Sequence, residues 1–153
     1  RSTLFPYTTL FRSPEIQVVG VSADRAAVMH HSLRAGKPVE MEEKETIADA
    51  LAGGFFGLTS VNHYTFQMCQ EYVDETVLVS DEEIAQAMAL TLKEHHLVVE
   101  GAGAVGIAAL LQRRVSKVGQ NVAIVVTGGN VDLAMLLEII KNYGHWEPNP
   151  QQG

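Results

Sequence analysis

The sequence is poor in cysteine and in long apolar runs. Cys69 is the only cysteine among 153 residues, which excludes an intramolecular disulfide and a thiolate metal cluster. A reducing, cytoplasmic setting suits such a chain. No apolar run reaches the roughly 18 uncharged residues that a membrane-spanning helix requires. We therefore predict a cytoplasmic protein with no membrane partner.

Basic residues are also scarce, and they are not clustered. Lysine and arginine number 11 against 18 acidic residues, which gives a formal net charge of −7. Nucleic acids and anionic lipid surfaces are bound through basic patches, so we exclude nucleic acid as a partner. Aromatic residues make up only 7% and charged residues 19%, while 46% of the chain is hydrophobic. This balance favours an aliphatic α/β core over a disordered chain.

The start of the chain differs from the rest. Residues 1–13, RSTLFPYTTLFRS, nearly repeat themselves and show neither helical nor strand periodicity. They lack the apolar core and cleavage site of a signal peptide, and they resemble translated adaptor sequence. We predict that residues 1–13 are artefactual or disordered, that residues 14–146 form the folded unit, and that residues 147–153 are a polar tail.

The body alternates short β-branched runs with helical stretches. Such alternation predicts an α/β fold, with a parallel sheet flanked by helices. Ser80 and Glu83 have the spacing of a capping box, which places a helix start between them. The expected strands are 15–21, 74–79 and 122–126, with a weak extended segment at 37–41 and a short apolar segment at 97–99. One helix is expected to follow a cap at Ser22 or Asp24 and to end at Gly36, and another to begin at residue 46. Further helices are expected at 63–72, 81–95, 107–115 and 133–142, with a loop at 53–57.

A glycine motif, Gly101, Gly103 and Gly106, matches the G-x-G-x-x-G pattern of dinucleotide-binding proteins. Glycines in that pattern let the backbone approach a pyrophosphate at a helix N-terminus. The acidic residue that should end the next strand and hold a ribose hydroxyl is missing. A Rossmann-like nucleotide-binding module therefore stays open as an alternative.

A second motif, Thr127-Gly128-Gly129-Asn130, lies between an apolar run and a helix. A hydroxyl there would stand at the carboxyl end of a parallel strand, where open α/β sheets bind ligands. The glycines would let a flat ring approach the backbone. The alternative is an ordinary strand–helix turn in which Thr127 caps the helix.

Together these motifs resemble the C-terminal part of the fold-type-II enzymes that depend on pyridoxal phosphate (PLP), which have a tryptophan synthase β-like fold. The likeness covers about residues 14–143 and is similar to threonine and serine dehydratases and serine racemase. The stretch from 63 to 80 also looks somewhat like hydroxyectoine-utilisation dehydratases. The four stretches that carry the family likeness, in this order, are PEIQVVGV, ETIADALA, VVEGAGAVGIAAL and VAIVVTGGNVDL.

The resemblance implies cofactor-binding roles for four residues. Thr127 matches the hydroxyl that bonds the pyridine nitrogen of PLP, with Gly128 behind it. Glu100 matches a glutamate near the ring, although it can also be read as a charge stabilised by a helix dipole. Ala50 stands where the family usually has glycine against the cofactor.

The catalytic lysine of this family is absent. The resemblance places that Schiff-base lysine and a phosphate-binding loop in a segment before Pro14, and neither is found here. We therefore predict no catalytic residue in the chain, and an enzyme fragment that is inactive alone. The intact enzyme would be a lyase acting on threonine, serine or another hydroxy amino acid, with a homodimer as one expected assembly.

No metal site is expected. Some relatives hold a divalent cation with a glutamate where this chain has Ser22, and Asp24 alone offers too few oxygen ligands. The adjacent histidines His30-His31 and His95-His96 point to different faces, so we expect them on the surface rather than around a metal.

Overall fold

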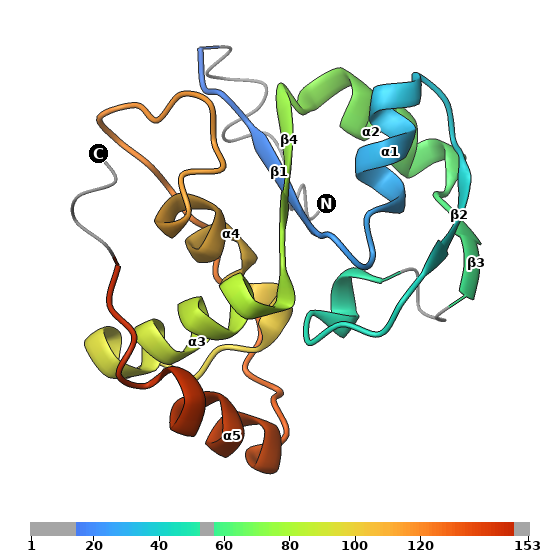
Figure 1. The fold of residues 1–153 in the computed structure, drawn as a ribbon. Helices are drawn as coiled ribbons and strands as arrows, with labels where there is room; N and C mark the ends of the chain where they lie inside the picture. Colours follow the sequence, from blue (N-terminus) through green and yellow to red (C-terminus); the bar gives the residue numbers. More distant parts are fainter. Residues whose placement is uncertain (1–14, 53–56, 149–153) are drawn as a thin grey trace, which may run out of the picture.

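The computed structural model describes residues 15–52 and 57–148. Our expectations for residues 1–13, for the loop at 53–56 and for the tail from 149 onward lie outside these residues. Within them the chain forms a mixed α/β fold in which a parallel pair of strands is flanked by helices (Figure 1). The elements are β1 (Val19–Ala23), α1 (Val28–Ala35), β2 (Glu40–Glu43), η1 (Asp49–Leu51), β3 (Gly57–Ser60), α2 (His63–Tyr72), β4 (Glu75–Val79), α3 (Asp81–His95), α4 (Gly101–Leu111) and α5 (Leu133–Tyr143).

The parallel pair is made of β1 and β4, with Val21 opposite Val77. The register is fixed at the start of the strands, where the Val18 N–H donates to the Asp74 carboxylate at 2.7 Å. A second, antiparallel pair joins β2 to β3. The sequence missed β3, because it begins at the last glycine of a run that predicts a loop.

The helices lie on both sides of the β1–β4 pair (Figure 1). On one side, α1 and α2 gather beside the β2–β3 pair. On the other, α3 and α4 pack against each other, and α5 packs on α3. No helix of the described ranges combines the length and the apolar character that crossing a bilayer demands.

The core lies mainly between the parallel strands, α3 and α4. Ile84 and Met88 of α3 are almost fully buried there, beside Ala104 and Ala108 of α4. Small residues on α4 let the two helices approach closely, so the core is aliphatic, as the composition predicts.

Helix ends were predicted with mixed success. The capping box is confirmed: the Ser80 hydroxyl accepts from the Glu83 N–H at 3.2 Å, and the Glu83 carboxylate accepts from the Ser80 N–H at 2.7 Å. The left-handed end of α1 at Gly36 is also confirmed. The predicted start of α1 is wrong, because Ala27 precedes the first turn and no side chain caps it. The helix expected from residue 46 shrinks to the single turn η1.

Helix α4 begins six residues earlier than predicted. It starts at Gly101 and ends at Leu111, whereas the sequence suggested 107–115. Glycine lowers helix propensity in isolated segments. Here Gly101 and Gly103 are buried against neighbouring backbone, and tertiary packing outweighs propensity.

The predicted buried strand at 122–126 is wrong. These residues form neither strand nor helix, and they are exposed, with Val125 81% exposed. The sequence has the β-branched composition of a strand, but a strand also needs a neighbour that pairs with its backbone. None of the described strands pairs with this segment.

His30 also differs from expectation. It was predicted on the surface, but it is 7% exposed and its ring packs edge-on against His31. Its Nδ1 atom has no hydrogen-bond partner among the described residues. Burial lowers the pKa of His30, and the nearby His31 and Arg34 lower it further. The folded chain therefore favours neutral His30.

A pH dependence of stability follows. His30 binds its proton more weakly in the folded chain than in the unfolded chain, whose histidine pKa is about 6.5. Its contribution is therefore complete above about pH 6.5 and is lost as pH falls from there through the lowered folded pKa. We expect His30→Leu to reduce the loss of unfolding free energy between pH 7.5 and 5.5 by up to about 1 kcal/mol. Urea titrations would measure it. His95→Leu, at an exposed helix end, is the control, and equal effects of the two variants would contradict the assignment.

Candidate cofactor site

Three segments far apart in the sequence meet through glycines. We call them the glycine junction: residues 47–48, 100–103 and 127–130. A Cβ atom added at Gly101 would lie 2.1 Å from the Ile47 carbonyl oxygen, and one added at Gly103 would lie 2.1 Å from the Thr127 carbonyl oxygen. Real Cβ atoms do not approach backbone this closely, so the junction requires glycine at both positions.

The contacts of the third glycine complete the explanation of the G-x-G-x-x-G motif. A Cβ at Gly106 would lie 2.8 Å from the Ile124 side chain. All three glycines thus face other segments of the protein rather than an open surface for a pyrophosphate. The following run also lacks the strand of a dinucleotide-binding unit. The nucleotide-binding interpretation finds no support in these contacts.

Glu100 ties the first motif to the second. Its carboxylate accepts the Asn130 N–H at 3.1 Å, and its own N–H donates to the Gly128 carbonyl oxygen at 3.3 Å. Glu100 is the N-cap of α4, but its side chain makes no capping hydrogen bond to that helix. Its contacts therefore hold the loop at 128–130, as well as placing a charge at the helix N-terminus.

Gly128 is shaped by the same contact. It has a φ of +72°, and a Cβ there would lie 2.2 Å from Cδ of Glu100. The left-handed backbone and the Glu100 carboxylate each favour glycine at this position. The sequence indicated only that a flat group can approach the loop, and the structure adds that one side of Gly128 is filled by Glu100.

Thr127 does not cap the following helix. That alternative is wrong, because Asp132 is the N-cap of α5 and its carboxylate accepts the Met135 N–H at 3.0 Å. The Thr127 carbonyl faces Gly103, while Thr127 and Gly128 as residues are exposed. The Thr127 side chain therefore has no capping role at the start of α5.

The remaining predicted residue, Ala50, lies in η1 and is exposed. Its N–H donates to the Asp49 carboxylate at 2.8 Å. Two residues earlier, Ala48 is fully buried within the junction. The structure therefore brings Glu100, Thr127 and Gly128 together directly, and places Ala50 just beyond the segment that meets Gly101.

The exposed side of the junction fits the ring of PLP in its chemistry. A neutral hydroxyl at Thr127 can bond a ring nitrogen, and the glycines beside it offer backbone without side chains to a flat group. For a metal, the described residues contain no group of three or more histidine, cysteine or carboxylate side chains placed to hold an ion. The absence of metal binding stays a prediction.

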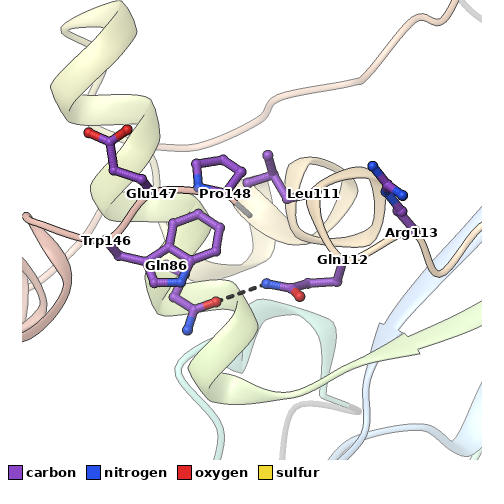
Figure 2. Close-up of a pocket in the computed structure, with 7 residues that line it drawn as sticks. All are labelled: Gln86, Leu111, Gln112, Arg113, Trp146, Glu147 and Pro148. Carbon is purple, nitrogen blue, oxygen red and sulfur yellow. Dashed lines mark hydrogen bonds between the residues drawn. The ribbon is translucent and has the colours of Figure 1, made fainter. Parts of the chain in front are cut away.

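A pocket elsewhere on the molecule is unrelated to this site. It has a volume of about 240 Å³ and is lined by Gln86 of α3, by the C-terminal end of α4 and by the C-terminal segment. Figure 2 shows the Gln112 amide donating to Gln86, with Trp146 next to Gln86. Polar side chains dominate the lining, and neither motif contributes to it, so we assign it no part in the cofactor site.

The residues that sequence reasoning missed contribute backbone atoms. The Ile47 and Thr127 carbonyls and the Asn130 N–H carry the junction. Backbone contacts of this kind leave no residue-type signal except glycine in the partner, and that signal was read as a nucleotide motif.

The fold and the glycine junction are those expected of the fold-type-II PLP enzymes, and the solved structures that resemble this chain belong to the same class. A threonine deaminase of T.th. matches with a TM-score of 0.70 and 32% identity over 80% of this chain and 42% of its own. The processed threonine deaminase isoform 2 of Solanum lycopersicum matches with a TM-score of 0.73 and 29% identity, covering 88% of this chain and 36% of its own.

The family model "Pyridoxal-phosphate dependent enzyme" matches residues 5–128, and the chain belongs to that family. It is 42% identical over 128 residues to an L-threonine ammonia-lyase of Thermotoga maritima, covering 84% of this chain but 30% of the relative. The family resemblance and the PLP cofactor read from the sequence are thereby confirmed. The chain spans about a third of the length of this relative.

Proposed function

We propose that this chain supplies one wall of the PLP pocket of a hydroxy amino acid dehydratase, a threonine or serine ammonia-lyase. The observation that carries the proposal is the glycine junction, in which the half-buried Glu100 is hydrogen-bonded to the exposed loop at 127–130. The names of the relatives support the substrate class. The single cysteine, Cys69, supports a cytoplasmic setting.

In this proposal Thr127 bonds the ring nitrogen of the cofactor through its hydroxyl. A neutral hydroxyl does not hold that nitrogen protonated, which tempers the ring as an electron sink and favours elimination over transamination. Gly128 and Gly129 admit the ring to the backbone, and Ala50 places a methyl group where the family usually has glycine against the cofactor. Glu100 keeps the loop in place through the Asn130 N–H.

When bound, the cofactor would withdraw electrons from the substrate Cα so that its proton and then the β-hydroxyl leave, giving overall a 2-keto acid and ammonia. None of the residues of this wall is a lysine, and the five lysines of the chain lie in unrelated contexts. We therefore propose that the chain alone catalyses no turnover.

The exposed segment at 122–126 supports completion of the pocket by further protein. Its valines are apolar, exposed and β-branched, which is typical of a segment that forms a strand once another strand pairs with it. In this proposal the missing neighbours come from the part of a family enzyme that carries the lysine and the phosphate loop.

The test compares the chain alone with the chain complemented. PLP and borohydride are added to the isolated chain, and to the chain co-expressed with the part of the Thermotoga maritima relative that precedes the match. We expect no PLP fixed on the isolated chain. We expect cofactor absorbance and keto acid formation in the complemented sample, both reduced by Thr127→Ala and restored by Thr127→Ser.

Two results would contradict the proposal. One is stoichiometric fixation of PLP on a lysine of the isolated chain, found by peptide mapping. The other is a complemented sample that forms a complex and binds PLP equally well with threonine or alanine at position 127.

A further inference from the structure

The segment that precedes Ala50 is held by two charged residues that the proposed cofactor role does not use. They are Arg25 and Asp81, each two residues beyond the end of a strand, β1 and β4 respectively. Because β1 and β4 are parallel and in register, their carboxyl ends meet at one edge of the pair. The Arg25 Nε atom lies 3.8 Å from the Asp81 carboxylate.

Arg25 forms hydrogen bonds to residues 44 and 45 through both its backbone and its side chain. Its carbonyl oxygen accepts the Lys44 N–H at 2.8 Å. Its Nε donates to the Glu45 carbonyl oxygen. These two bonds run to adjacent residues, so they fix both the position and the direction of the chain that enters the segment.

Asp81 contacts the next residue of the segment, Thr46. Its carboxylate accepts a hydrogen bond from the Thr46 hydroxyl, and the same hydroxyl oxygen accepts the Ala48 N–H at 3.2 Å. Asp81 lies in the first turn of the 15-residue helix α3, where the helix dipole stabilises a negative charge. Its side chain is 31% exposed, against 47% for Arg25.

The opposite side of the segment meets the start of α4. The Ile47 carbonyl oxygen is the atom that a Cβ at Gly101 would strike, and Ala48 is fully buried. Residues 46–48 are thus held between the charged pair on one side and the start of α4 on the other. A shift of Thr46 would carry Ile47 away from Gly101.

We propose that Arg25 and Asp81 are positioning residues that set the wall of the cofactor pocket formed by residues 46–50. We call the contacts of Arg25 and Asp81 with residues 44–46 the clamp. The identity of the wall rests on the proposed function, whereas the clamp rests only on these contacts. Asp81 carries most of the effect at Ala48, because its carboxylate accepts from the Thr46 hydroxyl that the Ala48 N–H bonds, whereas Arg25 bonds residues 44 and 45. Arg25 adds the direction of entry.

Amide hydrogen exchange on the full chain, followed by NMR, tests the clamp. Thr46→Ala removes the acceptor of the Ala48 N–H, and Asp81→Asn removes the charge that orders the hydroxyl. We expect exchange at the Ala48 amide to speed up about fivefold or more in Thr46→Ala, because a buried N–H that loses its acceptor is destabilised by at least about that factor. Asp81→Asn should give a smaller increase.

Matched variants separate positioning from general stability. Glu82→Gln removes a carboxylate from the same helix turn and should leave Ala48 unchanged, while Thr46→Ser keeps the hydroxyl and should restore slow exchange. The Met88 amide in the middle of α3 reports global opening. Unchanged exchange at Ala48 in Asp81→Asn would overturn the proposal, whatever Thr46→Ala does, as would equal acceleration at Met88 or in Glu82→Gln.

If Thr46→Ala unfolds the chain, the comparison of Asp81→Asn with Glu82→Gln decides the matter. The measurement needs no PLP. Failure of the chain to complement a dehydratase would therefore contradict the proposed function without affecting the exchange result. Unchanged exchange at Ala48 would contradict the clamp without affecting the proposed function.

Discussion

Replacing Gly103 with alanine is expected to lower the unfolding free energy by at least about 3 kcal/mol. The new Cβ would lie 2.1 Å from the Thr127 carbonyl oxygen, so either α4 or the loop at 127–130 must move. Neither moves easily, because α4 is packed in the core and the loop is bonded to Glu100. Urea unfolding followed by far-ultraviolet circular dichroism would measure the loss.

Gly119→Ala is the control for this prediction. It lies in the same C-terminal half, and its added Cβ would meet only the Asn121 carbonyl oxygen, at an ordinary 3.9 Å. Its effect should stay within about 0.5 kcal/mol. If the two variants unfold at the same urea concentration, the close approach of Gly103 to Thr127 does not exist in solution.

Gly128→Ala is expected to cost roughly 2–3 kcal/mol, from two separate sources. Alanine resists the left-handed backbone, with φ at +72°, and its methyl group would displace the Glu100 carboxylate from the Asn130 N–H. The displaced group is the end of a flexible side chain, so the chain should remain folded. Urea titration is again the measurement.

Gly36→Ala measures the cost of the left-handed backbone alone. Gly36 has nearly the same φ, +70°, with nothing within 4 Å of an added Cβ. Its cost should be that of the backbone alone. Combining Gly128→Ala with Glu100→Ala should then cost less than the sum of the two single variants, since the clash is gone. Strict additivity would show that Glu100 does not lie against Gly128.

Local chemistry made parts of this fold predictable. The capping box at Ser80 and Glu83 and the left-handed end of α1 at Gly36 depend on residue type and spacing, and both are confirmed. The order of β1, β4, α3 and α5 also follows from the apolar pattern. These features are decided within a few residues, so a single sequence contains them.

Other features depend on distant partners and were therefore missed or misread. The composition at 122–126 has the propensity of a strand, but these residues form none, because a strand forms only where another backbone pairs with it. His30 was placed on the surface, because nothing in the adjacent histidines shows which one faces inward. The start of α4 at Gly101 depends on the Ile47 backbone, more than fifty residues away.

The candidate site divides in the same way. Thr127, Gly128 and Glu100 were predicted from the family likeness, and the structure brings them together. Their roles toward the cofactor stay predictions. The sequence alone did not show why the G-x-G-x-x-G glycines are needed, since backbone carbonyls impose that need. Nor did it show the clamp of Arg25 and Asp81, whose members look like ordinary surface charges.

The exposed segment at 122–126 has a practical consequence for handling the isolated chain. Asn121 to Thr127 is a seven-residue window without charge or proline, and its valines and isoleucine favour cross-β stacking. The formal net charge of −7 supplies colloidal repulsion between chains at low ionic strength. Added salt screens that repulsion. We therefore expect the isolated chain to self-associate through this window first at high protein concentration and high ionic strength.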